Sequence, residues 1–122
     1  MQIVRDSLPT RYLPRAYRPG ELRINDTLYH TPVIIGAETL TELAPIGAVT
    51  QLGAAQAAAL LALGPEIVLL GTGAEHAFAP TDFSARFLEK GVGFESMGTA
   101  AACRTFSVLI AEQRRVVALL LP

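Results

Sequence analysis

Two short runs of the sequence contain almost no polar residue, and they constrain the fold more than any other feature. Residues 67–70 read I-V-L-L, and residues 115–121 read R-V-V-A-L-L-L. A strand with one solvated face alternates apolar and polar residues, whereas a strand of a parallel sheet covered by helices on both faces is apolar throughout. The two runs therefore predict central strands of such a sheet.

Three helical segments alternate with these strands. The alanine- and leucine-rich residues 53–63 end at Gly64-Pro65, which is typical of a helix stop. Thr81 is expected to cap a helix that runs to residue 89, and Thr99 one that runs to about residue 112. With a strand at residues 92–95, the order from residue 53 is αβαβαβ. Right-handed crossovers then predict parallel strands with helices outside.

The N-terminal part of the chain has different signals. Residues 21–25 and 27–30 flank Asn25-Asp26, a good turn pair, and predict a short β-hairpin. Residues 32–35 predict a third strand. Residues 39–49 stay ambiguous, with a candidate strand at Ala48-Val49. The fold class that these residues predict is α/β, a single domain with a mostly parallel sheet, helices on its faces and a short N-terminal β-hairpin.

Residues 1–19 are rich in arginine and proline, and we expect a flexible extended arm there, with the α/β domain at residues 20–122. Residues 1–23 carry a net charge of about +3 against about −4 for the remainder. Two interpretations stay open, a solvated tail or an arm that binds a partner or docks on the domain itself.

Charge and cysteine content exclude several classes of protein. The net charge of −1 gives no field that would attract nucleic acid, so no nucleic-acid partner is expected. One cysteine, Cys103, excludes an intramolecular disulfide and a multi-cysteine zinc site, and it suits a reducing, cytoplasmic setting. Residues 43–65 carry no charge, but their glycines, prolines and glutamines argue against a transmembrane segment.

The glycine pair of Gly71-Thr72-Gly73 follows a central strand and raises the question of a phosphate site. A dinucleotide fingerprint needs a third glycine where His76 stands, and a helix that starts directly; a phosphate-binding Walker loop needs Gly-Lys-Ser/Thr. Neither pattern is present. The plain interpretation is that the glycines allow a turn at positive φ or a close approach of the backbone.

Geometry offers a second interpretation. Parallel strands at 67–70 and 92–95 bring the loops that follow them to the same sheet edge, where ligands of α/β proteins often bind. Helix-start amides attract anions, and a side chain just past the first turn leans back toward that end. The residues of this candidate ligand crevice are Gly71, Thr72, Gly73, Gly98, Thr99 and Arg104. The alternative is that Thr99 only caps its helix and that Arg104 lies in solvent.

Cys103 has two interpretations. It shares one helical face with Phe106 and Ile110, which predicts core packing, whereas a position near a helix N-terminus would favour a nucleophilic thiolate. We expect packing, since only His30 and His76 are available as a base. A zinc site from those two histidines and Cys103 would need three spatial coincidences. Neither a metal, a cofactor nor a catalytic residue is therefore expected.

The segments L-L-G-T-G, G-V-G-F-E-S-M-G-T-A-A-A-C-R-T-F-S-V-L and R-R-V-V-A-L-L-L resemble a small family described mainly as a domain of unknown function. The family includes the mitochondrial assembly factor 3 of NADH:ubiquinone oxidoreductase and small bacterial relatives. The resemblance implies a three-layer α/β fold with a mixed sheet and no established catalytic activity. Where the family usually has an aspartate and an asparagine, this chain has Gly98 and Ser107.

Two functions are therefore expected from different classes. By resemblance, the chain is a non-enzymatic accessory domain of a bacterial cytosolic protein. Its partner would be a subunit or another assembly factor of a respiratory membrane complex. The alternative is a small-molecule or anion-binding domain, with or without catalysis, that uses the crevice between loops 71–73 and 96–99. The sequence does not indicate an oligomeric state.

Overall fold

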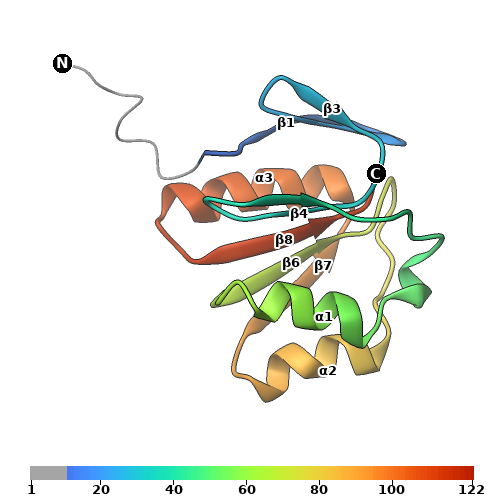
Figure 1. The fold of residues 1–122 in the computed structure, drawn as a ribbon, viewed down its shortest axis with the longest axis vertical. Helices are drawn as coiled ribbons and strands as arrows, with labels where there is room; N and C mark the ends of the chain where they lie inside the picture. Colours follow the sequence, from blue (N-terminus) through green and yellow to red (C-terminus); the bar gives the residue numbers. More distant parts are fainter. Residues whose placement is uncertain (1–10) are drawn as a thin grey trace.

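A computed structural model describes residues 11–122 of the chain (Figure 1). In chain order the elements are β1 (Pro14–Arg18), β2 (Glu21–Ile24), β3 (Thr27–Tyr29), β4 (Val33–Ile35), β5 (Leu40–Glu42), the 3-10 helix η2 (Val49–Gln51), α1 (Ala54–Leu61), β6 (Ile67–Gly71), α2 (Thr81–Glu89), β7 (Gly93–Met97), α3 (Thr99–Ala111) and β8 (Val116–Leu120).

The central sheet has five strands in the order β5-β4-β8-β6-β7. Strand β6 pairs in parallel with β7 and with β8, while β4 pairs antiparallel with β8 and β5. The two apolar runs thus form adjacent strands inside the sheet, and the expected mixed sheet is confirmed. The parallel half consists of β6, β7 and β8. Helices α2 and α3 form the crossovers between these strands, as the αβαβαβ order predicted.

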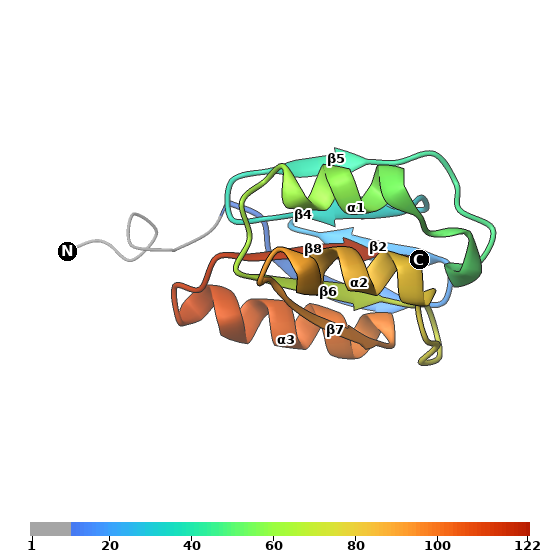
Figure 2. The same ribbon diagram turned by 90° about the horizontal axis from the view of Figure 1, so that it is seen from below.

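The sheet separates two apolar cores, and β6 and β8 contribute to both. Successive residues of β8 alternate between the cores, with Val116, Ala118 and Leu120 in the first and Val117, Leu119 and Leu121 in the second. The first core lies between the sheet, α3 and the small sheet of β1, β2 and β3. The second lies under α1 and α2, which cross the opposite face of the sheet (Figure 2). Burial on both faces explains why these strands carry no polar residue.

The small sheet extends the expected hairpin by one strand. β2 and β3 pair around Asn25, whose φ of 53° lies in the left-handed region that turns require. Strand β1 pairs antiparallel with β2, with Tyr17 opposite Leu22. The boundary expected at residue 20 is therefore wrong for residues 14–18, which belong to the folded domain. Residues 1–10 of the expected arm lie outside the described residues.

Three local expectations also differ from the structure. The ambiguous stretch 39–49 contains strand β5, and Val49 begins the helix η2 instead of a strand. Helix α2 has Pro80 at its N-cap and α3 has Gly98, so Thr81 and Thr99 are the first helical residues and do not cap. The hydroxyl of Thr99 is bonded elsewhere, as described below.

Within the described residues, no helix combines the length and the apolar composition that a membrane crossing requires. The uncharged stretch 43–65 contains η2 and α1, which Leu52 and Gly53 separate.

Candidate functional site

The loops that follow β6 and β7 meet the chain after β8 at one edge of the sheet, and backbone hydrogen bonds join the three segments. The amide of Thr72 donates to the Met97 carbonyl (2.8 Å), and the amide of Thr99 donates to the Gly73 carbonyl (2.8 Å). The amide of Leu121 donates to the Gly71 carbonyl (2.9 Å). We call this arrangement the sheet-edge joint.

Thr99 is the centre of the sheet-edge joint. Among the described residues, Thr99 is the polar residue that is fully buried. The hydroxyl accepts a hydrogen bond from the Gly73 amide (2.8 Å) and donates one to the Leu121 carbonyl (2.6 Å). The hydroxyl therefore uses both its donor and an acceptor position to connect three segments of the chain. This bonding, and not helix capping, explains a threonine at the first helical position.

At both glycines of the 71–73 loop, a residue with a side chain would be sterically unfavourable. Gly73 has a φ of +99°, which a side chain would strain. A Cβ on Gly71 would lie 2.9 Å from Thr99 Oγ1 and 3.1 Å from Thr99 Cα. The interpretation that these glycines turn the chain and allow a close approach is confirmed.

Thr72 organises the rest of its loop. Its hydroxyl donates to the Glu75 carbonyl (2.6 Å), with the Met97 carbonyl also in range at 3.1 Å, and accepts from the Ala77 amide (3.1 Å). The amides of Gly73 and Thr99, which an anion in the expected crevice would use, already donate to the protein. Five of the six expected crevice residues thus meet in a hydrogen-bonded joint. An anion there stays a prediction.

Arg104, the sixth residue, lies on a different part of the surface. It is exposed and lines a groove of about 400 Å³ between β1 and α3, which we call the β1–α3 groove. The groove is lined by Pro14, Arg15, Ala16, Tyr17, Ala100, Cys103, Arg104 and Ser107. The structure places Arg104 beside β1 and Ala100, and a role of Arg104 toward an anion at the helix start stays a prediction.

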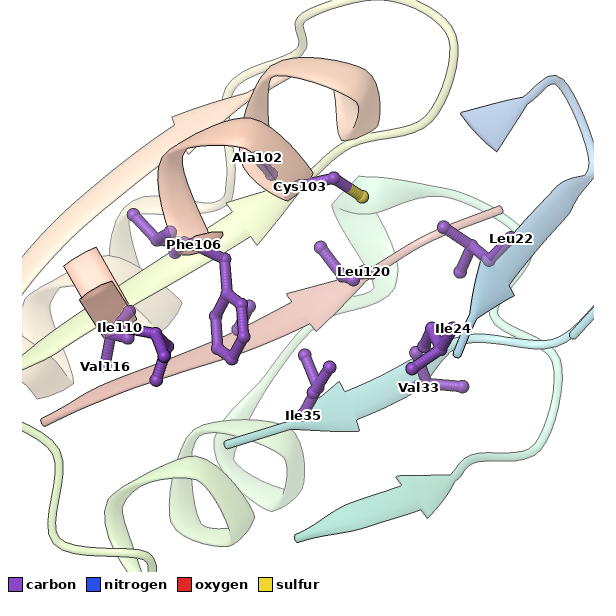
Figure 3. Close-up of a cluster of buried hydrophobic side chains, with 12 residues drawn as sticks. Leu22, Ile24, Val33, Ile35, Ala102, Cys103, Phe106, Ile110, Val116 and Leu120 are labelled. Carbon is purple, nitrogen blue, oxygen red and sulfur yellow. The ribbon is translucent and has the colours of Figure 1, made fainter. Parts of the chain in front are cut away.

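Cys103 is 7% exposed, and its sulfur points from α3 toward the small sheet on the side of Leu22 (Figure 3). Burial raises the pKa of the thiol to about 11, with Arg104 opposing the shift. The expected core packing is confirmed. The two histidines lie elsewhere: His30 Nε2 is 3.5 Å from Glu21, and His76 Nε2 is 3.3 Å from Ser96 Oγ. Among residues 11–122, no group of three or more His, Cys, Asp or Glu side chains could hold a metal ion.

Tyr17 is the residue that sequence reasoning missed. Its hydroxyl oxygen is buried and has no hydrogen-bond partner in the described part of the protein. Burial, followed by the nearby Cys103 thiol, raises its pKa. The available signal was Pro19-Gly20, a turn dipeptide whose glycine has a φ of +84° and which joins β1 to β2. Because residues 1–19 were expected to form an arm, Tyr17 was not expected to pack on the domain.

The chain is similar to solved proteins along most of its length. It is 37% identical to a Xanthomonas campestris protein with an NMR structure, at a TM-score of 0.83, covering 93% of this chain and 86% of that one. A crystal structure described as an outer membrane protein from Bartonella henselae is 30% identical, with a TM-score of 0.79 and coverage of 93% and 97%.

A curated relative in Francisella tularensis subsp. holarctica is named "13 kDa major membrane protein". It is 27% identical over 103 residues, which are 84% of each chain. The family model described as "Protein of unknown function (DUF498/DUF598)" matches residues 14–121. That match begins at β1 and ends after β8, and it confirms the kind of family that the glycine and threonine motifs indicated. The chain belongs to the DUF498/DUF598 family of proteins of unknown function.

Proposed function

We propose that this protein is a non-enzymatic accessory domain that binds a membrane protein at the cytoplasmic side and assists assembly of a respiratory complex. The observation that carries the proposal is the sheet-edge joint, in which the Gly73 and Thr99 amides already donate to the protein itself. In α/β proteins ligands commonly bind at the carboxyl ends of the strands. Here Thr99 is 0% exposed and fills that position with bonds to the protein itself.

The neutral thiol of Cys103 supports a non-enzymatic role. A thiol with a pKa of about 11 supplies almost no thiolate near neutral pH, and the thiolate is the nucleophile. Cys103 also packs in the first core beside Phe106. The Cys103 thiol therefore serves as a packing group in the core and not as a nucleophile.

The loop between β6 and α2 supports a protein-binding role. Phe78 is 81% exposed, which is unusual for an aromatic side chain, and its ring contacts His76 edge-on with centroids 4.6 Å apart. His76 in turn lies 3.3 Å from Ser96 Oγ of β7, so the loop is tied to the sheet. A large apolar ring held in place at the surface costs little entropy to bind, which is typical of interface hot spots.

The names of relatives support a location at a membrane. The Francisella relative is called a membrane protein and the Bartonella structure an outer membrane protein. A domain of this kind reaches a membrane most simply by binding a protein that spans it. The family resemblance suggests that this partner is a subunit or assembly factor of NADH:ubiquinone oxidoreductase.

A deletion strain tests the proposal. Loss of the gene should lower NADH:ubiquinone oxidoreductase activity in membranes and the amount of intact complex on native gels. Wild type and Leu88→Ser should restore both, whereas Phe78→Ser should not. Leu88 is the matched control, because it is 79% exposed and lies at the far end of α2. Full activity in the deletion strain would refute the assembly role, and rescue by Phe78→Ser would refute the binding surface.

A further inference from the structure

The β1–α3 groove has one wall from each element. The helix wall is a single stripe of α3, Ala100, Cys103, Arg104 and Ser107, spaced three or four residues apart. The strand wall is residues 14–17 of β1, which among residues 11–122 pairs only with β2. A volume of about 400 Å³ falls in the range of small-molecule sites, which is roughly 300–1,000 Å³.

Tyr17 lines this groove and carries a buried hydroxyl that has no partner among the described residues. The hydroxyl oxygen exposes less than 1 Å². An unpaired buried hydroxyl costs about 1–3 kcal/mol relative to one that is bonded. Ser107, on the opposite wall, already donates to the Cys103 carbonyl at 3.1 Å and can only accept a further bond. A ligand oxygen that accepts from Tyr17 would remove the cost of the unpaired group.

The charges of the groove have one sign. Arg15 and Arg104 line it, and no acidic side chain does. Some arginines elsewhere are paired with an acidic group, as Arg114 is with Glu66 at 2.7 Å. Neither groove arginine forms an ion pair with a residue of the described part. Guanidinium groups bind carboxylates strongly and in two-point geometry.

The remaining lining is apolar. Pro14, Ala16 and Ala100 contribute methyl and methylene surface, and the Cys103 sulfur is buried at the edge of the first core. A bare oxyanion would leave this surface uncovered. A ligand that fits all the features therefore combines one oxyanion with an apolar body.

We propose that the β1–α3 groove is a binding site for small organic carboxylates, with the Tyr17 hydroxyl and the Arg15 and Arg104 guanidiniums holding the carboxylate. The site is separate from the Phe78 loop, and it does not depend on the assembly role proposed above. It lies outside the joint formed by the other five residues of the expected crevice and contains the sixth, Arg104.

NMR titration of the ¹⁵N-labelled full chain at constant ionic strength tests the site, with benzoate as the probe. Benzyl alcohol supplies the apolar body without the charge, phosphate the oxyanion without the body, and phenyl phosphate a different oxyanion on the same body. Benzoate should give saturable amide shifts at Ala16, Tyr17, Ala100 and Arg104. The three comparison compounds should give much smaller shifts at equal concentration.

Two variants and a control sharpen the test. Tyr17→Phe and Arg104→Gln should each weaken benzoate binding about tenfold or more, the loss expected for a hydrogen bond to a charged group. Arg86→Gln should leave the affinity unchanged, since Arg86 is an exposed arginine on α2. Without ligand, Tyr17→Phe should keep or raise the melting temperature, because it removes an unpaired hydroxyl and retains the ring.

Several outcomes would overturn the proposal. Absence of saturable shifts with benzoate, or unchanged affinity in Tyr17→Phe, would exclude the carboxylate site. Preferred binding of phenyl phosphate would contradict the carboxylate assignment. A lower melting temperature for Tyr17→Phe would mean that a water or the chain itself already bonds the hydroxyl, which also contradicts it.

Discussion

At the residue scale, three glycines of the sheet-edge joint differ in backbone conformation and in the space that a Cβ would find. Gly73 requires positive φ, Gly71 leaves no room for a Cβ, and Gly98 has an ordinary φ of −59°. At Gly98 a Cβ would lie 3.5 Å from the Gly73 carbonyl oxygen, which is ordinary contact. Three positions in one joint thus differ in what an alanine would cost.

We expect Gly73→Ala to lower the free energy of unfolding by about 1–3 kcal/mol, through backbone strain. Gly71→Ala should also destabilise by at least about 1 kcal/mol, because overpacking against Thr99 forces the backbone to move. Gly98→Ala is the matched control and should change stability by less than about 1 kcal/mol. Urea denaturation of the three variants measures the differences; an equal loss at Gly98 would contradict the steric account.

Cys103 gives a pH-dependent prediction at the same scale. Its pKa is about 11 in the folded protein against 9.0 ordinarily, so at pH 8 the native thiolate fraction is about a hundredfold lower than in the unfolded chain. Alkylation by iodoacetamide should be slower by at least that factor in native buffer than in denaturant. Similar rates would show that the thiol is accessible and ionised.

The sign of the linkage follows from the same shift. Because the folded pKa is raised, the thiol contributes stability that is complete below pH 9 and lost as the pH rises from about 9 toward 11. Cys103→Ala should remove this part of the pH dependence. Cys103→Ser should destabilise by roughly 1–3 kcal/mol, since it places a hydroxyl among apolar neighbours such as Leu22 and Phe106.

At the element scale, β1 joins the N-terminal part of the chain to α3. Tyr12 and Tyr17 pack against the first core from this segment, and Asn25 of the following turn holds it by a bond from the Leu13 amide to Oδ1 at 3.0 Å. Strand β1 also forms one wall of the β1–α3 groove. An arm without contacts would contribute nothing to stability, whereas this strand buries aromatic surface.

Deletion of residues 1–18 should therefore lower the free energy of unfolding by about 2–5 kcal/mol, from the apolar surface of two partly buried tyrosines. Arg18→Ala is the control: it removes the exposed ion pair with Glu21 (3.2 Å) and leaves the strand in place. Thermal and urea unfolding of the two proteins provide the comparison. An unchanged melting temperature after deletion would show that β1 adds no stability and that residues 1–19 form an independent arm.

At the scale of the whole molecule, the two cores share their central strands. Leu69 contributes to the first core, and Val68 and Leu70 contribute to the second. Because β6 and β8 cannot leave one core without leaving the other, we expect the domain to unfold as one cooperative unit. The β1–α3 groove lies on the side of the first core, and the loop with Phe78 lies between β6 and α2.

The amino-acid sequence by itself determined the central sheet, the three helices and the burial of Cys103. These features depend on patterns within one element: the unbroken apolar runs of β6 and β8, and the shared face of Cys103, Phe106 and Ile110. Such patterns act over a few residues and are visible without knowledge of neighbours. The hairpin of β2 and β3 was predicted for the same reason, from its turn pair.

Only the tertiary structure decided the roles of Thr99, Arg104 and Tyr17. The hydroxyl of Thr99 bonds Gly73 and Leu121, which lie 26 and 22 residues away in the sequence, instead of capping its own helix. Arg104 and Tyr17 share a groove because β1 packs on α3, more than 80 residues along the chain. A polar side chain takes the partner that folding brings within about 3 Å, and local sequence specifies which elements form but not which loops meet.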